Sequence, residues 1–299
     1  FHRVIKMLSL RILAKKLILL TYPIFRIKSL LESNFCPKVR VIILHDIRDS
    51  WLDPMKKFIM SIQNDFDFIT PQQFAKYMEG EFRLKRNSLL ITFDDGFKSS
   101  KLATSQCLAP SNIKALFFVC SDFLNLNDMD GRKFTAEKIY DGAMPAKQIG
   151  DFQLPMNVQD LKDLLAEGHM IGSHSANHAR FSKIVDISKL ESEIINSADK
   201  LENMLGTKIT AIAWPFGSLD SISAQSLRVI QRRYKFCFSG IRGSNTFKQN
   251  RLSIYRECID IDNTLLFNKF ICNNGLSLFY KGQRKVLQDM VNTATKDRP

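Results

Sequence analysis

The chain has 299 residues, of which 45% are hydrophobic and 24% charged, and its formal net charge is +13. These fractions are typical of a globular protein and exclude an intrinsically disordered chain. The positive charge favours an anionic partner, but no zinc-finger spacing, RNP-like strand or long Lys/Arg tract occurs, so nucleic acid is not an expected partner.

Residues 1–35 are predicted to form a basic N-terminal helical segment. The longest uncharged run, residues 17–25, is too short to span a bilayer, and no clear signal-peptide cleavage site follows it. Two interpretations fit: an ordinary helix packed on the domain, or a basic amphipathic helix that places residues 1–31 on an anionic membrane surface. The expected localisation is therefore cytoplasmic or peripheral to a membrane. None of the six cysteines forms a C-x-x-C pair, which fits a reducing compartment.

A catalytic domain is predicted over residues 36–280, where short apolar runs alternate with amphipathic segments. The predicted strands are residues 39–46, 88–93, 113–120, 169–172, 209–214, 236–239 and 253–259. The predicted helices are residues 51–80 with a break at Thr70-Pro71, then 158–167, 186–205, 221–235 and 264–272. About seven strand–helix alternations imply a parallel sheet with helices outside it. Residues 121–157 are predicted to be an irregular insertion near the mouth of a site, and residues 281–299 a frayed polar tail.

Polar residues gather at the carboxyl ends of four predicted strands, and in a β/α barrel these ends converge on one face. The four groups are His45-Asp46, Asp94-Asp95, His174 with His178, and Pro215-Phe216-Gly217. His169 precedes its strand instead, so a structural role on the opposite face is expected for it.

Two imidazoles and one carboxylate are a common ligand set for a catalytic zinc ion, and His174, His178 and Asp95 supply them. Co²⁺ and Ni²⁺ accept the same ligands. The spacing of the two histidines lets both reach one ion if the chain turns helically there. Asp94 points away from Asp95 along a strand, so it is the candidate base that takes a proton from water.

His45 is the remaining histidine at the correct strand ends and is the candidate acid that protonates the leaving amine. The backbone N–H of Phe216 is a candidate donor to the oxyanion, next to Pro215. Trp214 fits either the core or a surface on which a sugar ring stacks.

The stretches Thr92-Phe93-Asp94-Asp95-Gly96 and Gly172-Ser173-His174-Ser175-Ala176-Asn177-His178 resemble the motifs of the NodB-homology polysaccharide deacetylases, carbohydrate esterase family 4. The resemblance extends over roughly residues 39–260. It implies a distorted (β/α)7 barrel and metal-dependent removal of acetyl groups from N-acetylated sugars. It also implies that Asp94 is the catalytic base and that Asp95, His174 and His178 bind the metal.

Two departures from the family pattern occur. Ala213 stands where many members have an Arg that orients the catalytic Asp, and no His follows His178. Both departures resemble the branch that deacetylates poly-β-1,6-N-acetylglucosamine, in which the acid comes from an N-terminal strand, as His45 does here. Arg251 and Arg256 are candidate replacements for the missing Arg.

Two other functions stay open besides removal of N-acetyl groups from a bacterial-type polysaccharide or its precursor. One is a deformylase or deacetylase that acts on a lipid-linked sugar, which the basic N-terminus suits. The other is a catalytically inactive barrel that binds a glycan, against which the presence of both carboxylates and both histidines argues.

Overall fold

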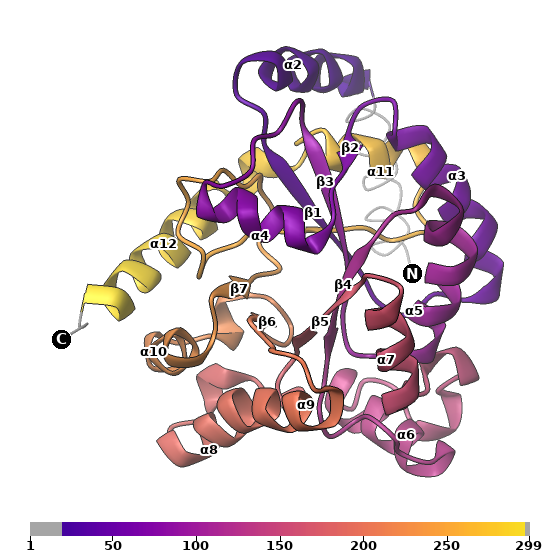
Figure 1. The fold of residues 1–299 in the computed structure, drawn as a ribbon, viewed down its shortest axis with the longest axis vertical. Helices are drawn as coiled ribbons and strands as arrows, with labels where there is room; N and C mark the ends of the chain where they lie inside the picture. Colours follow the sequence, from indigo (N-terminus) through magenta and orange to yellow (C-terminus); the bar gives the residue numbers. More distant parts are fainter. Residues whose placement is uncertain (1–19, 297–299) are drawn as a thin grey trace, which may run out of the picture.

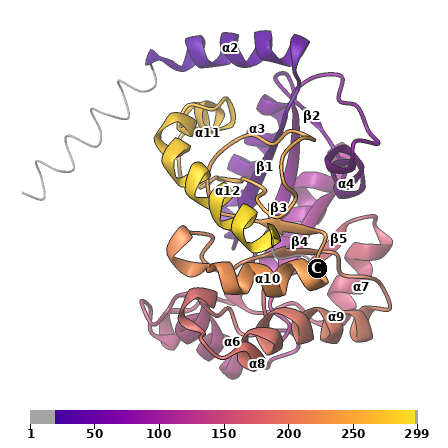
Figure 2. The same ribbon diagram turned by 90° about the vertical axis from the view of Figure 1, so that its left-hand side faces the viewer.

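The computed structural model describes residues 20–296, and its centre is a parallel β-sheet surrounded by helices (Figures 1 and 2). The strands are β1 (Val39–Leu44), β2 (Asp67–Phe68), β3 (Ser88–Phe93), β4 (Ala115–Val119), β5 (Met170–Ser173), β6 (Ala211–Ala213), β7 (Phe236–Phe238) and β8 (Glu257–Cys258). Their order is β7-β6-β5-β4-β3-β1-β8, with β2 paired to β3 outside this path.

The two ends of the sheet are joined by the segment that contains β8. Ile43 of β1 pairs with Cys258, and Ile254 forms a parallel bridge to Phe238 of β7. The segment at residues 254–258 therefore lies between β7 and β1 and completes a seven-membered ring. The expected distorted (β/α)7 barrel is confirmed, although the predicted strand 253–259 is reduced to β8 and this single bridge.

The helices are α2 (Tyr22–Phe35), α3 (Leu52–Ile62), α4 (Pro71–Glu79), α5 (Lys98–Ala103), α6 (Asp128–Phe134), α7 (Val158–Ala166), α8 (Ile187–Glu191), α9 (Ser197–Leu205), α10 (Ala224–Arg233), α11 (Leu265–Cys272) and α12 (Lys281–Lys296). The break expected near Thr70 is present, because the Thr70 hydroxyl accepts a hydrogen bond from the Gln73 N–H at the start of α4. The sequence did not predict β2, which lies inside the region expected to be helical. Among residues 20–296, no helix has both the length and the apolar character needed to cross a bilayer.

Side chains alternate between the inside of the barrel and the layer under the helices. One buried cluster fills the interior and includes Val39, Val41, Leu90, Leu116, Phe118, Phe236, Phe238 and Ile254. Phe74, Tyr77 and Met78 of α4 join this cluster and plug the amino ends of the strands. Because residues two apart in a strand face the same way, Thr92 and Asp94 continue the inward row that Leu90 begins.

The polar tail expected from Lys281 onwards is instead helix α12. Leu287, Val291 and Ala294 are fully buried at helical spacing, and the Ala294 carbonyl accepts a hydrogen bond from Gln231 of α10. These few apolar residues are hidden in the polar composition but lie on one face.

Residues 297–299, and residues 1–19 of the predicted N-terminal segment, lie outside the described residues. The expected catalytic domain over residues 36–280 stays a prediction.

The segment at residues 121–157 is more ordered than expected. It contains α6 and several short turns, and it buries Phe123, Ile149 and Met156. It lies at the end of the molecule opposite α2 (Figures 1 and 2). Ile139 and Tyr140 of this segment line the cavity at the carboxyl ends of the strands, so the segment lies near the candidate site, as predicted.

Candidate active site

The carboxyl ends of the strands surround a cavity of about 380 Å³. Six of the eight predicted site residues line it: His45, Asp94, Asp95, His174, His178 and Phe216. They follow β1, β3, β5 and β6 in the chain, so the parallel barrel is what brings them together. Pro215 and Trp214 do not line this cavity.

Asp95, His174 and His178 form a buried cluster whose candidate ligand atoms all lie within 4.8 Å of one another. Asp95 Oδ1 is 3.5 Å from His174 Nε2 and 3.4 Å from His178 Nε2. Two ligand atoms of a tetrahedral ion, each about 2.0–2.1 Å from it, are about 3.4 Å apart. The spacing of these three side chains therefore suits a tetrahedral divalent ion.

The hydrogen bonds behind the two rings orient them for metal binding. His174 Nδ1 is 2.8 Å from the Ala213 carbonyl oxygen, and His178 Nδ1 is 3.0 Å from that of Lys138. A carbonyl only accepts, so each Nδ1 carries a hydrogen, and in the neutral ring that a metal ligand requires each Nε2 directs a lone pair towards Asp95. Among the described residues, no hydrogen-bond donor reaches the buried Asp95 Oδ1. A cation between these atoms would relieve the repulsion, so the residues present fit a metal ion.

The loop that carries the histidines is not the helical turn that the spacing suggested. Residues 174–180 contain no helix, and Ser175 and His178 have φ values of 68° and 56°. These left-handed residues bring the two rings to a centroid distance of 5.1 Å. Burial lowers the pKa of His178 to about 4, so this ring is neutral at pH 7, as a metal ligand must be.

Asp94 is bound by a buried arginine on both of its oxygens. Arg256 Nη1 and Nη2 donate to Asp94 Oδ1 and Oδ2 at 2.7 and 2.9 Å, and both side chains are almost fully buried. Burial alone would raise the pKa of Asp94, but the Arg256 charge lowers it below its usual range, so the carboxylate stays ionised. Of the two candidate arginines, Arg256 therefore takes this place. Arg251 instead lies on the surface, 3.4 Å from Glu79.

His45 lies at the open side of the cavity and is exposed. Its neighbour Asp46 is half-buried and accepts a hydrogen bond from Gln153 Nε2 at 3.0 Å and one from the Tyr140 hydroxyl at 3.4 Å. Burial raises the pKa of Asp46. Gln153 and Tyr140 belong to the segment at residues 121–157, as does the Lys138 carbonyl that holds His178. No sequence motif indicated these three residues.

Phe216 packs between two site elements. Its ring lies 4.6 Å from the ring of His178, and the Arg180 guanidinium lies 3.6 Å from the centroid on the Phe216 ring. Arg180 is in turn 3.2 Å from Asp141, so the stack joins the His178 loop to the segment at residues 121–157. The contact of Phe216 with a metal-binding candidate places it in the site, while its backbone role towards an oxyanion stays a prediction.

The structure contradicts a sugar-binding role for Trp214. The side chain is fully buried in the core, and its Nε1 donates to the Ser218 carbonyl at 3.2 Å. Pro215 is also buried and is not among the residues that line the cavity. Both residues shape the turn that presents Phe216 instead of contacting a ligand. Trp214 thus has the core position that was the alternative for it.

His169 lies at the amino end of the barrel, as predicted. Its Nδ1 accepts a hydrogen bond from the Ala115 N–H at 2.9 Å, at the start of β4. The ring also packs edge-on against Phe117. Burial lowers the pKa of His169 to about 4, so it is a neutral structural residue.

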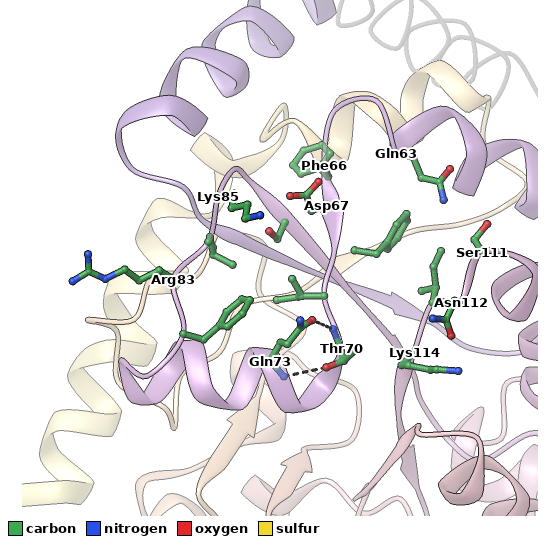
Figure 3. A pocket seen from close by; sticks show the side chains of 16 residues that line it. Gln63, Phe66, Asp67, Thr70, Gln73, Arg83, Lys85, Ser111, Asn112 and Lys114 are labelled. Atoms are coloured by element: carbon green, nitrogen blue, oxygen red, sulfur yellow. Dashed lines mark hydrogen bonds between the residues drawn. The ribbon is translucent and has the colours of Figure 1, made fainter.

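A larger cavity of about 500 Å³ lies at the amino ends of β2 and β3 (Figure 3). Three of its polar residues have structural partners: Thr70 and Gln73 bond to each other, and Asp67 pairs with Arg86 at 2.7 Å. It contains no cluster of candidate metal ligands among residues 20–296. Chemistry, and not volume, therefore identifies the smaller cavity as the candidate active site.

Comparisons with known proteins identify the family and the fold. The family model described as polysaccharide deacetylase matches residues 83–234, just over half of the chain. YheN from Bacillus subtilis (strain 168), whose name refers to the same family, is 22% identical over 178 residues, which are 59% of this chain and 51% of YheN. The chain spans about half or less of the length of the curated relatives that it matches.

Solved structures share the fold. IcaB from Ammonifex degensii is 17% identical with a TM-score of 0.60, over 81% of this chain and 97% of IcaB. A de-N-acetylase from Aggregatibacter actinomycetemcomitans is 14% identical with a TM-score of 0.60, over 78% of this chain and 99% of that one. The matched family model spans β3 to α10 and includes the Asp94-Asp95 and His174–His178 motifs, so the chain belongs to the polysaccharide deacetylase family.

Proposed function

We propose that this chain is a metal-dependent hydrolase that removes N-acetyl groups from amino sugars of a polysaccharide or its precursor. The observation that carries the proposal is the arrangement of two Nε2 atoms around the unpartnered Asp95 Oδ1, beside a carboxylate that an arginine holds ionised. Zinc is the first candidate ion, and Co²⁺ or Ni²⁺ suits the same ligands.

The residues around the cavity have separate tasks in this proposal. A divalent ion held by Asp95, His174 and His178 supplies electrophilic activation of water and of the acetyl carbonyl. Asp94 accepts the proton that the attacking water loses. His45, at the open side, donates a proton to the amine nitrogen as the carbon–nitrogen bond breaks, because an amide nitrogen leaves poorly as an anion. The products are acetate and a free amino sugar.

The substrate class follows from the family and from the names of structural relatives. The family acts on polysaccharides, and one relative of the same fold is named a de-N-acetylase. The cavity of about 380 Å³ is large enough for one sugar ring with its acetyl group, and its mouth is bordered by Tyr140 and Asp46. We infer that an N-acetylated glycan is the partner.

The test is acetate release from N-acetylglucosamine oligomers by the metal-stripped and the zinc-restored full chain. Release should depend on zinc, and Asp94→Asn should abolish it because an amide cannot take the proton. Asp199→Asn, which changes a surface ion pair with Arg233, is the matched control and should keep full activity.

Two outcomes would contradict this proposal. A protein that binds no metal would show that the ligand assignment is wrong and would favour an inactive glycan-binding barrel. A protein that binds one zinc ion but releases no acetate would contradict the substrate, and deacylation of lipid-linked amino sugars would then become the leading function.

A further inference from the structure

Helix α2 has two faces of opposite character, and the inner face is attached to the barrel. Arg26 pairs with Asp65 at 2.7 Å, and the Ser29 carbonyl and Ser33 hydroxyl accept hydrogen bonds from Asn87 at 2.8 and 2.7 Å. Phe25 packs edge-on against Phe270 of α11. This face fixes how the helix lies on the molecule.

The outer face of α2 is a continuous apolar row that no described residue covers. Its members are spaced by four, three, four and four residues, which keeps them within a narrow arc of the helix. They are Leu20, Ile24, Ile27, Leu31 and Phe35, which are 76%, 67%, 58%, 57% and 88% exposed. We call this row the α2 stripe. Five large apolar side chains in one exposed row are far more than scattered surface residues, so this row indicates an interaction surface.

Positive charge predominates in the sequence of this part of the chain. Residues 1–35 contain seven Lys and Arg and a single acidic residue, Glu32. Glu32 is already paired with Lys38 at 3.2 Å. Arg83 and Lys85, both exposed, lie just before the start of β3 at the same end of the barrel. An apolar row flanked by positive charge is complementary to an anionic lipid surface, and a second copy of the same basic segment would repel it.

We propose that the α2 stripe docks this protein on an anionic lipid bilayer. The helix lies in the plane of the interface, with its apolar row in the boundary between headgroups and acyl chains. Helix α2 crosses one end of the molecule in both views (Figures 1 and 2), and the exposed fractions of its apolar row show that the row faces solvent.

The position of α2 also determines which way the catalytic cavity faces. α2 is bonded to Asn87 at the amino end of β3, whereas Asp94 and Asp95 follow the carboxyl end of the same strand. A six-residue strand is about 20 Å long, so the candidate active site lies on the side away from the bilayer. Together with the proposed function, this orientation favours a glycan chain that extends into water as the substrate over a sugar attached to a lipid in the same membrane.

Co-sedimentation of the full chain with vesicles tests the docking. The protein should pellet with phosphatidylcholine/phosphatidylglycerol vesicles and much less with phosphatidylcholine alone. The triple variant Ile24→Gln, Ile27→Gln, Leu31→Gln should reduce the bound fraction by about tenfold or more, because it removes apolar burial from the interface. The control Met129→Gln, Val185→Gln, Leu278→Gln changes equally exposed apolar residues elsewhere and should bind as the wild type does.

Three results would overturn the docking proposal: no binding to anionic vesicles, equal binding by the stripe variant, or a dimer in solution that only the stripe variant dissociates. Zinc content and the melting temperature of each variant check that the fold is intact. The readout does not depend on acetate release, so a failure of docking is distinguishable from a failure of the proposed function.

Discussion

Two adjacent aspartates with different partners define the chemistry at the residue scale. Asp94 continues the inward row of β3 and meets Arg256, which lies inside the barrel. Asp95 has a φ of 73°, which turns its carboxylate towards the two histidines. The change of direction after β3 thus separates the proposed proton acceptor from the proposed metal ligand within one dipeptide. Asp94 is buried, so its carboxylate depends on the positive charge of Arg256.

The Arg256 contact can be tested with Arg256→Lys. Lysine keeps the charge but cannot form two parallel bonds to Asp94, so kcat for acetate release should fall by about 10- to 100-fold. Zinc content should not change, because Arg256 is not among the candidate ligands. Arg251→Lys is the matched control, since Arg251 is exposed and pairs with Glu79 on the surface. Equal activity of the two variants would show that Arg256 does not position Asp94.

At the scale of elements, two segments have more structure than their composition indicates. The segment at residues 121–157 supplies a carbonyl to His178 and two side chains to Asp46, so it shapes the wall of the cavity. Helix α12 packs against α10 on the outside of the barrel (Figure 1). Each segment is held by a few buried apolar residues within a polar sequence.

Leu287→Ala tests whether α12 is part of the folded domain. Removing a fully buried Leu side chain should lower the free energy of unfolding by about 2–4 kcal/mol. Val286→Ala, one residue earlier and 47% exposed, should change it by less than about 0.5 kcal/mol. Urea denaturation measures both. If the two variants unfolded at the same urea concentration as the wild type, α12 would not contribute to the stability of the domain.

At the scale of the whole molecule, the two ends of the barrel have different roles. The carboxyl ends of the strands hold the ionisable residues of the candidate site. The amino ends are closed by α4 and α2 and contain His169 as a neutral, buried acceptor. His169 is therefore a titratable group at the end away from the candidate site.

His169 contributes to the pH dependence of the stability. Its pKa is about 4 in the folded chain and about 6.5 when unfolded, so the unfolded chain binds more protons between these values. The free energy of unfolding should therefore fall as pH decreases from about 6.5 to about 4, by on the order of 2 kcal/mol.

His169→Asn tests this contribution, because its Oδ1 can accept the Ala115 N–H without titrating. Urea melts of the variant at several pH values should show a flatter curve than the wild type. Since all other titrating groups are shared, the difference isolates His169. Parallel curves would contradict the assignment.

The sequence by itself determined the features that depend on short stretches of neighbouring residues. Apolar runs that end in Asp95 and in His174 indicated parallel strands, and parallel strands in a barrel necessarily bring their carboxyl ends together. The ligand set, the candidate base and the barrel could therefore be predicted without coordinates.

Only the tertiary structure decided the contacts between distant segments. Arg256 and Asp94 are 162 residues apart, and Arg251 was an equal candidate until β8 was placed beside β1. Closure of the ring determines which side chains of each strand face the interior of the barrel. It therefore decided that Arg256 faces Asp94 and that Trp214 lies in the core. Contacts of this kind depend on how whole elements pack, because the local sequence determines neither the neighbour of a strand nor the face that it presents there.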